Sequence, residues 1–130
     1  MTLLLDTSIL IAIQRDDKEV IKKIEDLKKS HFQPASISFI SYFEFYSGLI
    51  EKNIKNRQFM IDFLNKFNCL KASSITAEIL AGLKHKYDEK GIVIGLADLI
   101  IASHAKEGNM TLITQDKIFE KIDEINKIRL

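Results

Sequence analysis

The chain has 130 residues, of which 46% are hydrophobic and 28% are charged, a composition typical of one globular domain, 1–130. This excludes a disordered chain, and each apolar stretch is shorter than the roughly 18 residues of a membrane-spanning helix. No Lys or Arg precedes Arg15, and Asp6 interrupts the first apolar stretch, so we expect no secretory signal and a cytoplasmic protein. The single cysteine, Cys69, excludes an internal disulfide and is expected to be a small buried residue.

Short apolar runs alternate along the chain with runs of helical spacing. The first run, from Thr2 to Asp6, is typical of a buried strand, and Thr7 or Ser8 is a favourable N-cap for the following helix. Strands separated by helices predict a three-layer α/β/α sandwich around a parallel sheet of four or five strands. The expected helices span 7–14, 18–27, 39–51, 57–67, 75–89, 96–107 and 117–122, and the expected strands span 2–6, 33–37, 69–72, 110–113 and 127–130.

Four acidic residues lie where such a fold binds ligands. In open parallel sheets, ligands bind outside the carboxyl ends of the strands. Asp6 ends the first strand and Asp116 follows the run 110–113, so both are expected at this edge. Glu44 and Asp98 lie on helices that begin from the same edge, and the helix of Glu44 is so apolar that we expect most of it to be buried.

Simpler roles for these acids stay open. An aspartate near a helix N-terminus is often only a cap, which is an adequate account of Asp98 or Asp116 taken singly. A buried salt bridge is a harder account of Glu44, because no basic residue lies between His31 and Lys52. Four convergent carboxylates repel one another unless cations neutralise them, and oxygen ligands suit Mg²⁺ or Mn²⁺. Such ions, singly or as a pair about 3.5–4 Å apart, can direct water at a phosphodiester.

Four motifs of the chain each contain one of these acids. They are Leu5 to Leu10 with Asp6, Ser41 to Gly48 with Glu44, Ala97 to Ala102 with Asp98, and Leu112 to Asp116 followed by Phe119. The order and spacing of these motifs make the chain similar to the PIN-domain nucleases, in particular the VapC-type toxins of prokaryotic toxin–antitoxin pairs. The resemblance implies a PIN-like fold and a Mg²⁺- or Mn²⁺-dependent endoribonuclease that is homodimeric and held inactive by a cognate antitoxin.

The resemblance also implies roles for single residues. Asp6, Glu44, Asp98 and Asp116 match the acidic quartet of the family, with Asp6 and Asp98 as the firmest metal ligands and Asp116 as the most variable one. Glu44 would hold metal or its water. The hydroxyl groups that would orient these carboxylates belong to Thr7, Ser8 and Thr114.

The chain departs from the family pattern at one position. Many relatives carry a further acid directly before the phenylalanine, where this chain has Ile118. Asp116 is then the only acid ahead of Phe119 in that loop, which weakens the case for a full second metal site.

Other functions remain compatible with the sequence. The domain could bind RNA or a partner without cutting, act as a metal-dependent phosphatase on small molecules, or process RNA without a toxin role. The three histidines, His31, His85 and His104, are scattered and are expected to be surface or packing residues, because no serine or cysteine nucleophile motif lies near them.

One helix carries more aromatic residues than a single core face can cover. We therefore expect part of it to contact a second subunit or an antitoxin helix, and a basic antitoxin side chain could enter the acidic site. The aromatic residues are Phe39, Tyr42, Phe43, Phe45 and Tyr46.

Overall fold

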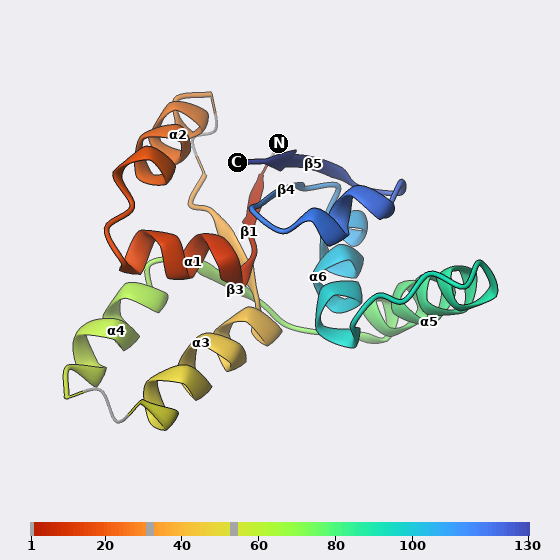
Figure 1. Cartoon of the computed structure of the whole chain (residues 1–130), viewed down its shortest axis with the longest axis horizontal. Coiled ribbons are helices and arrows are strands. Elements are labelled where there is room, and N and C mark those ends of the chain that lie inside the picture. The colour runs from red at the N-terminus through yellow and green to blue at the C-terminus, as the bar shows by residue number, and fades with distance from the viewer. Residues whose placement is uncertain (1, 31–32, 53–54) are drawn as a thin grey trace.

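A five-stranded, all-parallel sheet lies between two layers of helices in the computed structural model, which describes residues 2–30, 33–52 and 55–130 (Figure 1). The predicted three-layer α/β/α sandwich is confirmed. The strands are β1 (Leu3–Leu5), β2 (Ser36–Ser38), β3 (Asn68–Leu70), β4 (Thr111–Thr114) and β5 (Asn126–Arg129). The helices are α1 (Thr7–Gln14), α2 (Lys18–Lys28), α3 (Phe39–Glu51), α4 (Arg57–Leu64), α5 (Ser74–Glu89), α6 (Leu96–Glu107) and the 3₁₀ helix η1 (Lys117–Lys121).

The strand order is β3-β2-β1-β4-β5, so the direction in which strands are added reverses between β1 and β4, and we call this place the switch point. The chain first builds outward from β1 to β2 and β3, and then crosses to the other side of β1 to add β4 and β5. Leu5, the last residue of β1, is the register partner of Ile113, which directly precedes the last residue of β4. Ligands of open parallel sheets bind where the strand order reverses, so the carboxyl ends of β1 and β4 mark the expected site.

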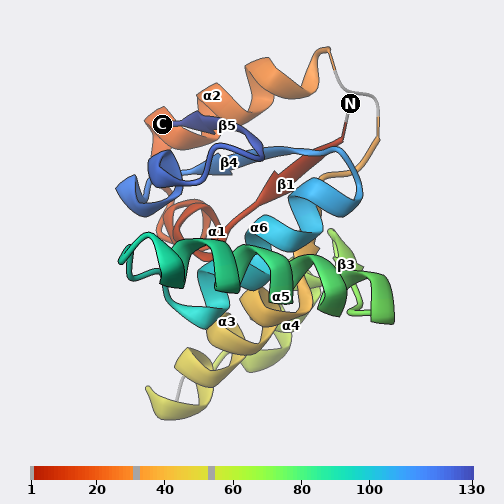
Figure 2. The same ribbon diagram turned by 90° about the vertical axis from the view of Figure 1, so that its right-hand side faces the viewer.

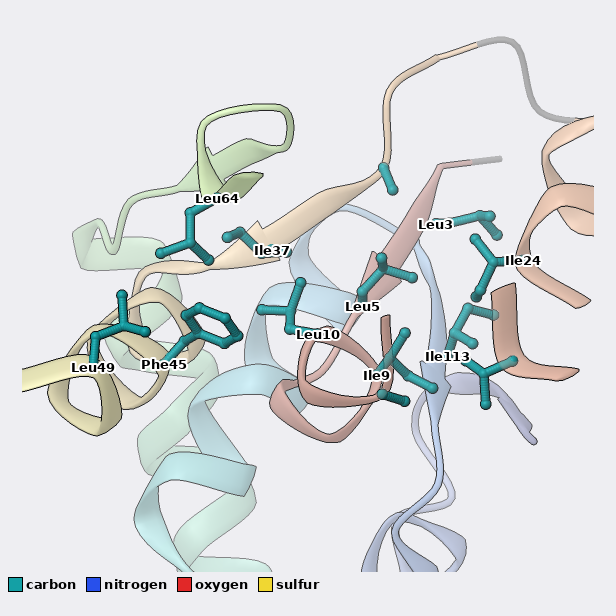
Figure 3. Packing of buried hydrophobic residues seen from close by; sticks show 13 residues of the cluster. Leu3, Leu5, Ile9, Leu10, Ile24, Ile37, Phe45, Leu49, Leu64 and Ile113 are labelled. Atoms are coloured by element: carbon teal, nitrogen blue, oxygen red, sulfur yellow. The ribbon is translucent and has the colours of Figure 1, made fainter. Parts of the chain in front are cut away.

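Alternate side chains of the central strands supply two separate cores. Leu3 and Leu5 of β1 pack with α1, α2, α3 and α4 on one face, as Figure 3 shows. Leu4 points to the opposite face and packs with α5 and α6, which Figure 2 shows in front of the sheet. Because β1 is buried on both faces, its sequence is apolar throughout and shows no alternation of apolar and polar residues.

Several local boundaries differ from the sequence-based expectations. Asp6, instead of Thr7 or Ser8, is the N-cap of α1, because its side chain accepts a hydrogen bond from the backbone N–H of Ile9. The strand expected at 33–37 lies at Ser36–Ser38, where the backbone pairs with β1 and β3.

The prediction that Cys69 is buried is wrong. It lies on β3, at the edge of the sheet, and its side chain is exposed. No helix of the described residues is long and apolar enough to cross a membrane.

Candidate functional site

The carboxylate of Asp6 is buried at the switch point and held by three donors. Its side chain is 3% exposed because it begins α1 between the ends of β1 and β4. Oδ1 accepts hydrogen bonds from Ser8 Oγ at 2.6 Å and Ile9 N at 3.1 Å, and Oδ2 accepts one from Thr114 Oγ1. Burial raises the pKa of Asp6 above its usual value, while these donors favour the charged form and oppose the rise.

The loop after β4 is tied to the same carboxylate. Thr114 Oγ1 accepts a hydrogen bond from the backbone N–H of Asp116 at 2.9 Å, and Ser8 Oγ accepts one from the backbone N–H of Gln115 at 3.1 Å. The Asp116 side chain in turn accepts from the backbone N–H of Ile118 at 3.0 Å and caps η1. Thr114 and Ser8 therefore fix both the Asp6 carboxylate and the position of Asp116.

Glu44 reaches the site from α3. Its Oε1 accepts a hydrogen bond from Thr7 Oγ1 at 2.7 Å, so the residue directly after Asp6 sets the position of Glu44. Glu44 is exposed, although the apolar sequence of α3 predicts a buried residue. Only three residues of this helix are buried, and Ser41 is the nearest of them to Glu44 on its face. The buried residues, Ser41, Phe45 and Leu49, follow one stripe of the helix, and Glu44 lies beside this stripe, accessible to a ligand.

The pKa of Asp98 is affected by the other three acids. Asp98 lies in the first turn of α6, whose N-cap residue, Gly95, has no side chain that could bind the helix. Burial, with a smaller contribution from repulsion by Asp116, Glu44 and Asp6, raises the pKa of Asp98 to about 6. The four predicted acids thus come from four separate segments of the chain, and the other three lie within electrostatic range of Asp98.

The chemistry of this donor set fits a hard divalent cation. All the acids offer carboxylate oxygens, and a cation would relieve the repulsion that raises the pKa of Asp98. In the part of the chain that the structure describes, no three His, Cys, Asp or Glu side chains are close enough to hold one ion together. Mg²⁺ is commonly bound through one or two carboxylates and keeps several of its waters, so this wider arrangement remains suited to it.

His85 and His104 take no part in this cluster. His85 is exposed and faces Glu89 at 3.2 Å, whereas His104 is buried and packs edge-on against the ring of Phe39. Both fit the predicted surface and packing roles, and His31 lies outside the described residues.

Sequence reasoning missed three polar residues beside Glu44. Gln14, Arg15 and Lys52 line a pocket together with it, between α1 and α3. Arg15 and Lys52 directly follow these helices, but nothing in the sequence indicates which sides of the two helices meet.

Comparisons with known proteins point to one family. The PIN domain family model matches residues 3–125. Ribonuclease VapC2 of Rickettsia felis is 28% identical over 127 residues, covering 96% of this chain and 95% of that protein. Ribonuclease VapC3 of Methanocaldococcus jannaschii is 34% identical over 104 residues, covering 79% of this chain and 97% of that protein.

Solved structures extend the likeness to the whole fold. The crystal structure of VapBC2 from Rickettsia felis bound to a DNA fragment from its promoter contains a chain with a TM-score of 0.85 and 29% identity, covering 100% of this chain and 99% of that one. A toxin–antitoxin complex from Klebsiella pneumoniae matches with a TM-score of 0.75 and 27% identity, covering 98% of this chain and 96% of that one.

Proposed function

Because the chain belongs to the PIN domain family, we propose that it is a Mg²⁺- or Mn²⁺-dependent endoribonuclease that hydrolyses RNA phosphodiester bonds. The observation that carries this proposal is the convergence of Asp98 with Asp6, Glu44 and Asp116: burial, together with repulsion by these three acids, raises the pKa of Asp98 to about 6. Two relatives that are named ribonucleases support the choice of RNA as substrate.

Each acid has a separate part in this proposal. Asp6 and Asp98 would be the main metal ligands, Glu44 would hold metal or a water on it, and Asp116 would complete the site. A bound divalent cation supplies a water of lowered pKa and positive charge that offsets the charge developing on the phosphate.

Hydroxyl groups of the chain orient the carboxylates of Asp6 and Glu44. Ser8 and Thr114 occupy both oxygens of Asp6 and limit the directions from which the carboxylate can meet a ligand. Thr7 does the same for one oxygen of Glu44 and leaves the other toward solvent.

The direct test is cleavage of a structured RNA by the pure chain with Mg²⁺ or Mn²⁺, next to an Asp98→Asn variant that keeps the side-chain shape. We expect cleavage by the wild-type chain, its loss on chelation by EDTA, and its loss in the variant. RNA that stays intact with both metals would contradict the proposal, and so would equal cleavage by the variant.

We also propose that the nuclease is the toxin of a toxin–antitoxin pair and acts in the cytoplasm. The likeness to chains of a VapBC2 structure and of a toxin–antitoxin complex supports this role. An antitoxin could block the site by placing a basic side chain among the acids, which attract a cation of any kind. Controlled expression should arrest growth, and co-expression of the neighbouring open reading frame should restore it. Normal growth without that partner would favour RNA processing instead.

A homodimer is the third part of the proposal. An exposed aromatic surface on α3 lines a shallow hollow formed by Tyr42, Phe43, Tyr46, Ser47 and Ile50. Phe43 is 59% exposed and Ile50 is 52% exposed, and the rings of Tyr42 and Tyr46 stack beside them. A contiguous apolar surface of this kind is typical of a protein interface.

A further inference from the structure

A pocket between α1 and α3 opens directly beside Glu44. Gln14 and Arg15 line it from the end of α1, and Gly48 and Lys52 line it from α3. Glu44 lines this pocket, which we call the α1–α3 pocket, and also accepts the hydrogen bond of Thr7, so this one residue belongs both to the pocket and to the acidic site. A ligand that extends from the acidic site along α3 would enter it.

The charges in the α1–α3 pocket are ordered along its length. Glu44 lies at the end next to the acidic site, and Lys52 follows it by eight residues on α3, about 12 Å along the helix axis. Arg15 and Lys52 are both exposed, and neither forms a side-chain ion pair among residues 2–30, 33–52 and 55–130.

A structural role for the two cations explains only part of this arrangement. Arg15 and Lys52 are the C-cap residues of α1 and α3, and a basic residue is favourable at a helix C-terminus. This preference does not require that two exposed side chains line the same pocket. Their shared position concentrates positive charge where a polyanion leaving the acidic site would pass.

We propose that the α1–α3 pocket binds the single-stranded RNA segment next to the scissile phosphodiester. Arg15 and Lys52 contact backbone phosphates, and the side-chain amide of Gln14 is placed to bind a base edge or a ribose hydroxyl. The cations offset the repulsion between RNA and the carboxylates, so the strand is held while its phosphodiester lies among the acids. This inference rests on the proposed function, which names RNA as the substrate.

Gly48 keeps the α1–α3 pocket open. It lies one turn after Glu44, and a Cβ at this position would meet nothing within 4 Å. A side chain here therefore projects into the space assigned to RNA without disturbing the helix core. Gly48→Ala adds only a methyl group, whereas Gly48→Leu fills the pocket.

The test measures RNA binding apart from cleavage. Fluorescence anisotropy of a labelled oligouridylate is followed in EDTA with the full chain, with Arg15→Gln, with Lys52→Gln and with the double variant. Lys84→Gln on α5 removes the same charge far from the pocket and is the matched control, since Lys84 pairs with Asp88. Circular dichroism establishes that each variant folds.

We expect each pocket variant to weaken binding roughly fivefold at low salt, and to make the dependence of log K on log salt shallower by about 0.7 per lost phosphate contact. Gly48→Leu should weaken binding, whereas Gly48→Ala should bind like the wild-type chain. Unchanged binding by the double variant would overturn the inference, and so would an equal loss in Lys84→Gln. If these variants weaken binding but the wild-type chain cuts no RNA with either metal, the pocket stands and the nuclease proposal fails.

Discussion

Thr114 and Asp6 come from neighbouring parallel strands and meet in a hydrogen bond, in which the threonine hydroxyl donates to Oδ2 of the buried carboxylate. The same hydroxyl accepts the backbone N–H of Asp116 at 2.9 Å. One side chain therefore links the end of β4, the first residue after β1 and the loop that carries a further acid. The geometry of the acidic site depends on this hydroxyl.

Thr114→Val should impair both activity and stability. Valine keeps the shape of threonine but leaves an Asp6 oxygen and the Asp116 N–H without their partner, so we expect unfolding free energy to fall by about 1–3 kcal/mol. Because the Asp6 carboxylate would lose its fixed orientation, RNA cleavage or metal affinity should fall by roughly 10- to 100-fold. Cleavage rates, Mn²⁺ titration calorimetry and urea unfolding measure these effects. Thr114→Ser keeps the hydroxyl and is the control; equal behaviour of the two variants would contradict this role.

Much of the fold follows from local patterns in the sequence. The limits of α3 and α6 are those predicted from the sequence, 39–51 and 96–107. The alternation of strand and helix implied a parallel sheet, and its carboxyl edge indicated where Asp6 and Asp116 would lie. These features depend on neighbours in the chain, so they can be inferred without a structure.

Features that depend on packing between distant elements could not be inferred in this way. Composition alone made Glu44 and Cys69 appear buried, but the buried residues of α3 follow one stripe and β3 lies at the sheet edge. The choice of Asp6 over Thr7 as the N-cap of α1 depends on the turn that joins β1 to this helix. Arg15 and Lys52 line the same pocket only because α1 and α3 pack against each other.

The metal-free protein should become less stable as pH rises through the titration of Asp98. Its folded-state pKa of about 6 is above the ordinary 3.8, so the folded protein holds a proton that the unfolded chain has lost. The stability that this proton brings is complete below pH 3.8 and is lost by about pH 6. The side chain of the Asp98→Asn variant cannot ionise at this position, so the variant should avoid this loss. Above pH 6 its unfolding free energy should exceed that of the wild-type chain by roughly 1–2 kcal/mol, a figure discounted for solvent screening.

Urea unfolding of both proteins in EDTA across this pH range measures the difference. Asp6, whose pKa is also raised, and Glu124, whose pKa is lowered, titrate in both proteins and should largely cancel in the comparison. A stability difference that stays constant between pH 3.8 and 6 would show that Asp98 titrates at its ordinary pKa in the folded protein.

Phe43→Ser should convert the proposed dimer into a monomer. Phe43 is 59% exposed in the single chain and lines the aromatic surface of α3, so its removal takes apolar area from the interface and costs the monomer little. Light scattering after size-exclusion chromatography measures the mass. Phe59→Ser on α4 is the matched control, because Phe59 is 67% exposed but does not line that surface. A wild-type chain that is monomeric at micromolar concentration would remove the basis for the dimer.

Mn²⁺ should stabilise the wild-type chain near neutral pH through the acidic site. A ligand that binds only the folded state adds about 2.7 kcal/mol at a concentration one hundred times its Kd, and it also removes the repulsion felt by Asp98. We expect the unfolding temperature to rise with Mn²⁺ in the wild-type chain, and to rise much less in Asp98→Asn. Asp26→Asn on α2 removes an exposed carboxylate that pairs with Lys29, and it should respond like the wild-type chain. An equal response from Asp98→Asn would mean that the stabilising ion binds elsewhere on the protein.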